Sequence, residues 1–117
     1  MSNVTVIGTL GADPELRFAK SGNAMLTLSV CENRKRGEET EAHWYDVGVV
    51  GKMAENVCES LRKGDRIIVV GQLEMQKWAD KSTGDNRTKV AIHAWQVGPS
   101  LEYASIEGLA KNERDDR

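Results

Sequence analysis

Residues 44–78, WYDVGVVGKMAENVCESLRKGDRIIVVGQLEMQKW, carry the pattern that decides the fold. Residues 44–50 are typical of a strand, and the segment after them has an apolar residue at every fourth position. This spacing predicts one amphipathic helix that packs on a core through a single face. Its apolar stripe consists of Met53, Val57 and Leu61. We expect the helix to end near Gly64, because glycine readily adopts the left-handed conformation that follows many helices. The β-branched residues 67–70 then predict a buried strand, which residues 72–78 extend outward.

Apolar periodicity predicts three more strands, at residues 4–10, 24–30 and 89–97. The charged residues 32–41 are expected to form a mobile loop, and residues 81–86 have the composition of a hairpin tip. The resulting order is three strands, one helix and two strands. That order predicts an all-β fold with one helix, the OB-fold, in which a five-stranded Greek-key barrel has its helix between strands three and four.

Composition limits the chain to a small protein with one domain. It has 117 residues, of which 39% are hydrophobic, so the core is real but small. The formal net charge of −2 does not predict a polyanionic partner, and any surface for nucleic acid must therefore be local. The N-terminus lacks the features of a signal peptide, and no window approaches the ~20 apolar residues of a membrane span. We expect a cytoplasmic protein without a membrane partner.

The two cysteines, Cys31 and Cys58, form no C-x-x-C pair. In a reducing compartment two such cysteines are expected to be free thiols. The alternative is a disulfide, within one subunit or between subunits, which would stabilise the assembly.

Two tryptophans lie among charged and polar neighbours. Trp44 and Trp78 belong to a chain with only three Trp, two Tyr and one Phe. Exposed flat side chains beside Lys and Arg are suited to stacking unpaired bases. For Trp44 the alternative is packing against the helix. Trp95 lies in an apolar run, and we interpret it as a packing or subunit-contact residue.

The phosphates of a nucleic acid would be bound by Lys and Arg side chains near these aromatic residues. The candidates lie in three groups, in the charged loop, at the helix end and in the last hairpin. They are Arg34, Lys35 and Arg36; Arg62, Lys63 and Arg66; and Lys77, Arg87 and Lys89. For the first group the alternative is a solvated loop that neighbouring glutamates neutralise.

Several blocks of the sequence, in order and without large gaps, closely resemble the bacterial single-stranded DNA-binding protein family. They are GTLGADPELRF (8–18), SG (21–22), Trp44, GKMAEN (51–56), LRKGD (61–65), GQL (71–73) and KW (77–78). The resemblance implies sequence-independent binding of single-stranded DNA by a homotetramer that needs no cofactor. It also implies that the first strand, with Asn3, Val4 and Val6, contributes to subunit pairing. Phe18 matches an aromatic position of the family, and it either stacks on a base or packs in the core.

The end of the chain resembles the actinobacterial branch of the family. In that branch the segment matching residues 98–104 forms an extra strand that clamps subunits together, so Tyr103 joins Trp95 as a candidate interface residue. We assign residues 1–104 to the OB-fold domain and residues 105–117 to a short polar tail. The tail mixes acidic with basic residues and lacks a terminal apolar pair, so tail-mediated recruitment of replication or repair enzymes is not expected. The chain is either a specialised paralogue or a shortened one.

Two aromatic positions of the family pattern are missing. Val50 stands where the family has a base-stacking aromatic residue, and the loop aromatic upstream of Trp44 is replaced within residues 34–36. The chain therefore has fewer base-stacking platforms, meaning aromatic side chains on which a base can stack. This implies weaker or more salt-sensitive binding than in the strongest members of the family.

Motifs for catalysis are weak. Residues 48–53 superficially resemble a phosphate-binding loop, but the glycine spacing differs and Met53 replaces the metal-binding Ser or Thr. His43 and His93 stand alone, so we expect neither an enzyme nor a metal site. The favoured function is the binding and protection of single-stranded DNA in replication, recombination or repair. The alternative is an OB-fold protein-interaction or assembly subunit with weak DNA binding.

Overall fold

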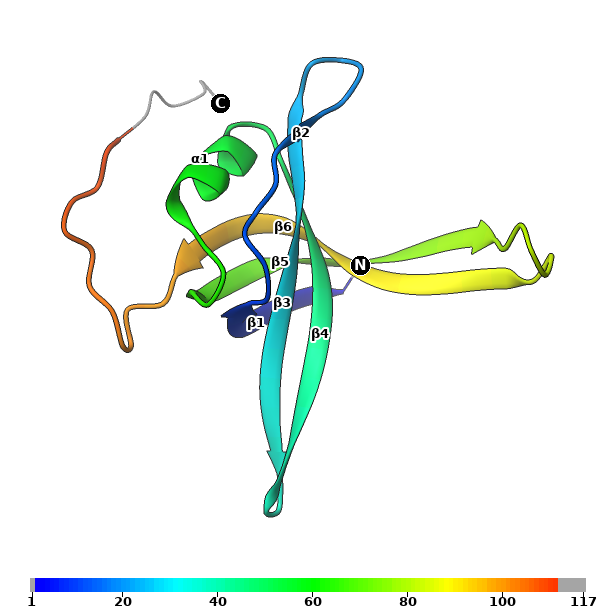
Figure 1. The fold of residues 1–117 in the computed structure, drawn as a ribbon, viewed down its shortest axis with the longest axis horizontal. Helices are drawn as coiled ribbons and strands as arrows, with labels where there is room; N and C mark the ends of the chain where they lie inside the picture. Colours follow the sequence, from blue (N-terminus) through cyan, green and yellow to red (C-terminus); the bar gives the residue numbers. More distant parts are fainter. Residues whose placement is uncertain (1, 112–117) are drawn as a thin grey trace.

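The computed structural model describes residues 2–111, and Figure 1 shows their arrangement. They form six strands and one helix. The elements are β1 (Asn3–Leu10), β2 (Arg17–Phe18), β3 (Ala24–Arg36), β4 (Glu39–Val50), α1 (Lys52–Ser60), β5 (Arg66–Ala79) and β6 (Asn86–Pro99).

Five of the strands close into a barrel. The sheet has the order β1-β5-β6-β4-β3-β2, and a further pairing of β1 with β3 at Thr9 and Leu10 closes it. The β4–β6 pairing is parallel, at Val47 and Gly48, whereas β1 and β5 pair antiparallel. This arrangement confirms the predicted OB-fold. The helix follows β4 rather than a third strand only because the two-residue β2 is counted as a strand of its own.

Alternate residues of the strands supply the core, as the period of two predicts. Val30, Val47, Ile67 and Val69 have no exposed surface at all. A β-bulge between Val70 and Gly71 interrupts the pairing of β5 with β6. A Cβ at Gly71 would lie 2.1 Å from the carbonyl oxygen of His93, so only glycine lets the two backbones approach this closely.

The helix α1 packs against the barrel through the predicted apolar stripe. Ala54 and Val57 are buried, and so is Leu61 just beyond the last helical residue, Ser60. The prediction that the helix ends near Gly64 was wrong, because Leu61 already has an extended backbone. Gly64 does adopt a φ of 92°, but it does so in the turn that leads to β5.

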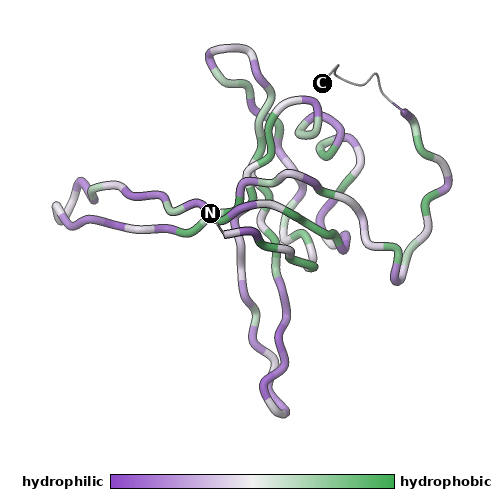
Figure 2. The backbone as a smooth tube through the Cα atoms, turned by 180° about the vertical axis from the view of Figure 1, so that it is seen from behind, coloured by the Kyte–Doolittle hydropathy of each residue, from purple (hydrophilic) through white to green (hydrophobic). Residues whose placement is uncertain are grey.

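Two long hairpins project from the barrel as arms (Figure 1). Residues 32–41 were expected to form a mobile loop, and that prediction was wrong. β3 and β4 remain paired as far as Arg36 and Glu39, and Gly37 makes the turn with a φ of 63°. The arm of β5 and β6 is paired out to Ala79 and Asn86, around the predicted hairpin tip. Figure 2 shows that both arms are mainly hydrophilic, whereas hydrophobic residues gather in the barrel.

Residues 100–111 follow β6 around the outside of the molecule without forming a strand. Ser100 N donates a hydrogen bond to the carbonyl oxygen of Arg66, which fixes the start of this segment. The clamp strand at residues 98–104 stays a prediction, because a strand of that kind would pair with a second subunit. Residues 112–117 of the predicted tail lie outside the described residues. No helix within residues 2–111 is long and apolar enough to cross a membrane.

Candidate nucleic-acid interface

Trp44 projects from an outward face of the barrel formed by β3 and β4. Val47 and Val49 of β4 point into the core, and successive side chains of a strand alternate between its faces. The even-numbered residues of β4 therefore point outward. Residues opposite each other in an antiparallel pair share a face, so the partners of these residues on β3 point outward too. We call this surface the Trp44 face. Its central residues are Thr27, Ser29 and Cys31 of β3 and Trp44, Asp46 and Gly48 of β4.

The indole ring of Trp44 rests on Gly11, just beyond the end of β1. A Cβ at Gly11 would lie 2.5 Å from Cζ3 and 2.8 Å from Cη2 of the ring, so the missing side chain is what leaves room for it. Gly11 is itself held by a hydrogen bond from its N–H to the carbonyl oxygen of Ser29. Trp44 nevertheless remains 60% exposed. It therefore does not pack against the helix: one edge of its ring lies against Gly11, and much of its surface is open to solvent.

The Trp44 face continues toward β2 with apolar but non-aromatic side chains. Met25 lies opposite Val50, and both are about half exposed. Arg17 of β2 pairs with Met25 and borders this end of the face. Phe18 is 64% exposed and lies outside the core, so the alternative that it packs there is excluded.

The arm of β5 and β6 carries Trp78, which is 49% exposed. Trp78 pairs with Arg87 across the arm, and Lys89 lies two residues further along the same face of β6. Both cations are held by carboxylates. Arg87 Nε lies 3.3 Å from Asp80 Oδ2 at the hairpin tip, and Lys89 forms an ion pair with Asp46 of the Trp44 face.

Asp80 organises the tip of this arm. Its Oδ1 accepts hydrogen bonds from the hydroxyl of Ser82 at 2.7 Å and from the backbone N–H of Ser82 at 2.9 Å. These bonds, the hydroxyl first, lower the pKa of the Asp80 carboxyl below its usual value.

The arm of β3 and β4 carries the predicted basic triplet, Arg34, Lys35 and Arg36. The three side chains are divided between the two faces of the arm. Lys35 pairs with Thr40 and shares a face with Cys31 and Trp44. Arg34 and Arg36 point to the opposite face, where Arg34 Nε lies 2.8 Å from Glu32 Oε1 and Arg36 Nε lies 3.7 Å from Glu41 Oε2.

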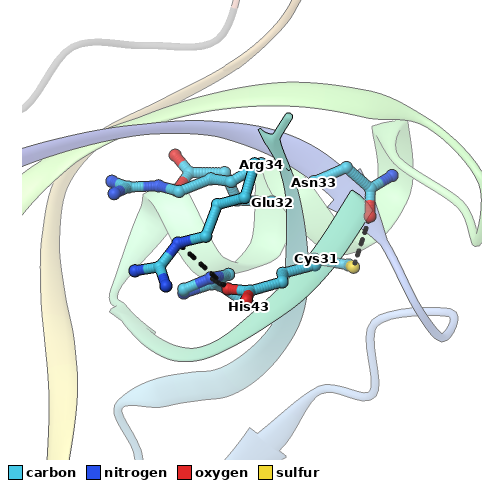
Figure 3. A network of polar contacts seen from close by, with 7 residues as sticks. Cys31, Glu32, Asn33, Arg34 and His43 are labelled. Atoms are coloured by element: carbon cyan, nitrogen blue, oxygen red, sulfur yellow. Dashed lines mark hydrogen bonds and ion pairs between the residues drawn. The ribbon is translucent and has the colours of Figure 1, made fainter. Parts of the chain in front are cut away.

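Figure 3 shows the polar contacts on that opposite face, with Arg34 bonded to Glu32 beside His43. Hydrogen bonding by Glu32 raises the pKa of the Arg34 guanidinium. Glu41 Oε2 also lies 3.3 Å from His43 Nε2. Only Lys35 of the triplet is therefore on the same side as Trp44, and the two arginines are neutralised by glutamates of their own hairpin.

The predicted cations at the helix end lie elsewhere on the barrel. Arg62 donates hydrogen bonds from Nη1 to the carbonyl oxygens of Cys58 and Leu61 at the end of α1. Arg66 Nε lies 3.5 Å from Glu102, and its guanidinium lies 5.8 Å from the centre of the Tyr103 ring. Arg66 begins β5 and Trp78 lies near its end, separated by about 40 Å of strand length at ~3.3 Å per residue.

Two further predicted cations complete the set. The backbone N–H of Lys63 donates to Asp13 Oδ1 at 2.7 Å, which ties the turn before β5 to the loop that follows Gly11. Lys77 pairs with Thr88 and so points away from Trp78, to the other face of the arm.

The predicted subunit-contact residues differ in what they can offer. Val6 is only 2% exposed and packs in its own core, so its side chain is not available to a partner. Asn3 is exposed and Val4 is half-buried, whereas Trp95 is 42% and Tyr103 is 81% exposed. Trp95 is the extra residue of the β-bulge, since Val70 pairs with Gln96 and Gly71 pairs with Ala94.

Both cysteines are free thiols in this chain. Cys31 Sγ lies 3.7 Å from Asn33 Oδ1 beside Trp44, and Figure 3 shows these two side chains together. Cys58 Sγ lies 3.6 Å from the carbonyl oxygen of Pro14. A disulfide between subunits stays a prediction. Among residues 2–111, no group of three or more His, Cys, Asp or Glu side chains is placed to hold a metal ion.

Two residues of the site were missed in the sequence. Gly11 supports Trp44, but its partner lies 33 positions later and no local pattern links them. Asp46 could have been found, because it lies two residues after Trp44 on a strand and so must share its face.

The comparisons with known proteins agree with this geometry. Residues 1–100 match the family model described as the single-strand binding protein family. The single-stranded DNA-binding protein of Paenarthrobacter nicotinovorans is 39% identical over 111 residues, which cover 89% of this chain and 65% of that protein. The protein of the same name from Mycolicibacterium smegmatis is 36% identical over 113 residues, covering 91% of this chain and 68% of the relative.

A third relative is longer. The single-stranded DNA-binding protein of Corynebacterium glutamicum is 39% identical over 113 residues, covering 91% of this chain but 50% of its own length. The chain thus spans between half and about two thirds of the length of these actinobacterial relatives.

Proposed function

Because the chain belongs to the single-strand binding protein family, we propose that it binds single-stranded DNA without sequence preference and protects it. The observation that carries this proposal is Trp44, exposed on an outward sheet face and seated against Gly11. An OB-fold commonly binds oligonucleotides on this part of its surface. The function is binding and not catalysis, in keeping with the family.

In this proposal the bases stack and the phosphates follow the cations. Trp44 and Trp78 are the two platforms, and Phe18 extends the path past the apolar Met25 and Val50. Each base stacked on an aromatic side chain contributes about 1–3 kcal/mol, a general range obtained by alanine substitution in proteins of this class. Val50 offers apolar contact without an aromatic face, so the platforms at Trp44 and Trp78 carry a larger share of the affinity.

Lys35, Arg87 and Lys89 are the predicted phosphate ligands best placed for these platforms. Lys35 shares the face of Trp44, and the other two share the face of Trp78. Arg34 and Arg36 would have to leave their glutamates to reach the same strand of DNA. The alternative function, a protein-interaction subunit with weak DNA binding, is not favoured, since the similar relatives are all named for single-stranded DNA binding.

We also propose that the protein is a homotetramer. Residues 3–8 of β1 pair with β5 along one edge, whereas pairing with β3 on the other edge begins only at Thr9. A free strand edge is suited to pairing with the same strand of a second copy. Ile7 and Ile68 lie directly opposite each other on the outside of this sheet and are 45% and 36% exposed. Together with Trp95, these two residues supply an apolar surface through which two dimers could contact each other to form the tetramer.

The proposed setting is the cytoplasm, on DNA of the nucleoid, during replication, recombination or repair. The OB-fold domain of residues 1–104 would perform the binding, and residues 98–104 would clamp subunits together. These assignments rest on the family to which the chain belongs.

Fluorescence titration with oligo(dT) tests the proposal. Stacking on Trp44 and Trp78 should quench the tryptophan emission, and affinity should fall with salt at a slope of about −0.7 per phosphate neutralised. Duplex DNA of the same length is the control, and it should bind far more weakly. Equal affinity for both, or no quenching by oligo(dT) at low salt, would exclude the proposed function.

A further inference from the structure

The ion pair between Asp46 and Lys89 lies where the nucleic acid is expected to pass. Asp46 is on the Trp44 face, two residues from Trp44, and Lys89 is on the same face of the arm as Trp78. The pair therefore bridges the two surfaces that carry the aromatic platforms. A carboxylate at this position is unexpected on a surface for a polyanion, because it repels the phosphates that the neighbouring cations attract.

The position of the pair also ties the arm to the barrel. β4 and β6 pair only at Val47 with Ile92 and at Gly48 with His93. Beyond these residues the arm departs from the barrel, and Asp46 and Lys89 face each other across the gap between the two strands. Both side chains keep a third to a half of their surface exposed, so a phosphate can reach Lys89.

We propose that Asp46 is an internal competitor for the DNA backbone: it holds Lys89 in the free protein, and single-stranded DNA must replace Asp46 with a phosphate on Lys89. This inference rests on the proposed function. Binding at this point is an exchange of one anion for another, so the net gain from Lys89 is small. Salt screens the Asp46–Lys89 ion pair that must be broken, so breaking it costs less at high salt, and this partly offsets the loss of the phosphate contact and flattens the salt dependence. Asp46 thereby lowers affinity without touching a base.

Asp46→Asn tests the competition, because it keeps the shape of the side chain and removes its charge. We expect oligo(dT) to bind about three- to tenfold more tightly at low salt. The salt slope should become steeper by up to about 0.7, the increment for one phosphate contact. The matched control is Glu59→Gln, which removes one charge from an exposed position on α1. It should change affinity by less than about twofold.

A double-mutant cycle distinguishes two explanations for tighter binding by Asp46→Asn: release of Lys89 for a phosphate, and the general effect of removing one negative charge from the surface. If Asp46 occupies Lys89, then Lys89→Gln should weaken binding by about two- to threefold in the wild type and by about tenfold in the Asp46→Asn background. Thermal unfolding of each variant confirms the fold, and Asp46→Ser provides a second removal of the carboxylate.

Two results would overturn the inference while leaving the proposed function intact. One is tight wild-type binding that Asp46→Asn improves no more than Glu59→Gln does. The other is an equal effect of Lys89→Gln in both backgrounds. If the wild-type protein itself fails to bind oligo(dT), the proposed function is wrong and the competition falls with it.

Discussion

Replacing Gly11 with alanine should weaken DNA binding by displacing an aromatic ring that Gly11 supports. The new Cβ would lie 2.5 Å from Cζ3 of Trp44, whereas carbon atoms in favourable contact are about 3.5–4.0 Å apart. The ring must therefore retreat by roughly 1 Å or swing to another rotamer. Gly11 does not have a positive φ, so its backbone accepts alanine without strain.

The structure predicts a large effect on binding and a small one on stability. Trp44 is 60% exposed and does not belong to the core, so moving its ring should cost less than about 1 kcal/mol of unfolding free energy. The stacking of one base contributes about 1–3 kcal/mol, so loss of the correct ring position should weaken binding about 5- to 150-fold.

The assay is fluorescence titration with oligo(dT) combined with thermal unfolding. Gly11→Ala should have little further effect in the Trp44→Ala background, because the two changes remove the same contact. Gly108→Ala is the matched control, since a Cβ there meets no atom within 4 Å and the residue lies outside the proposed interfaces. Wild-type affinity and unchanged tryptophan emission in Gly11→Ala would refute the reasoning.

Three other predictions follow from the arms, the sheet edge and the hairpin tip. Lys35→Gln should weaken oligo(dT) binding about threefold or more, because Lys35 shares the face of Trp44. Arg34→Gln should change binding less than twofold, because Arg34 is on the opposite face and is paired with Glu32. Equal effects of the two variants in the titration would contradict this placement. Ile7→Asp should leave the barrel folded but reduce the assembly below a tetramer in sedimentation velocity, because it puts a charge on the proposed contact surface; an unchanged mass would refute that contact. The lowered pKa of Asp80 means that its support of the hairpin tip is present above the unfolded-state pKa and is lost as the pH falls through the lower folded-state value. The amide proton of Ser82, observed by NMR during an acid titration, should follow that lowered pKa, and a transition at the usual value for Asp would contradict it.

The order of elements could be predicted from the sequence because apolar residues recur with a clear periodicity in the helix and in most of the strands. The alternation of Leu26, Leu28 and Val30 in β3 placed the core correctly. The prediction that the β-branched run 67–70 is buried throughout was wrong, because β5 alternates: Ile67 and Val69 are in the core and Ile68 points outward.

The charged hairpin of β3 and β4 was missed, because its pairing beyond Cys31 depends on the backbone ladder, which a run of charged residues does not reveal. Charge runs usually predict loops, and here glutamates of the same hairpin balance the cations: Glu32 on the same strand as Arg34, and Glu41 on the strand next to Arg36.

The types of residue in the candidate site could be predicted from the sequence, but the faces to which their side chains point could not. Trp44, Trp78 and Phe18 are exposed, as stacking residues must be. Adjacent positions of a strand point to opposite faces, so three consecutive cations cannot all serve one strand of DNA. The contact between Gly11 and Trp44 joins distant parts of the chain, and only the closed barrel brings it about.

The central claim is that single-stranded DNA binds by stacking on Trp44 and Trp78, and alanine substitution at both positions tests it most directly. Titration with oligo(dT) at fixed salt should show each single variant weakened by about 1–3 kcal/mol and the double variant weakened by more than either. All variants should retain the wild-type unfolding midpoint within a few degrees, because neither side chain is in the core. Wild-type affinity in both single variants and in the double variant would contradict the account.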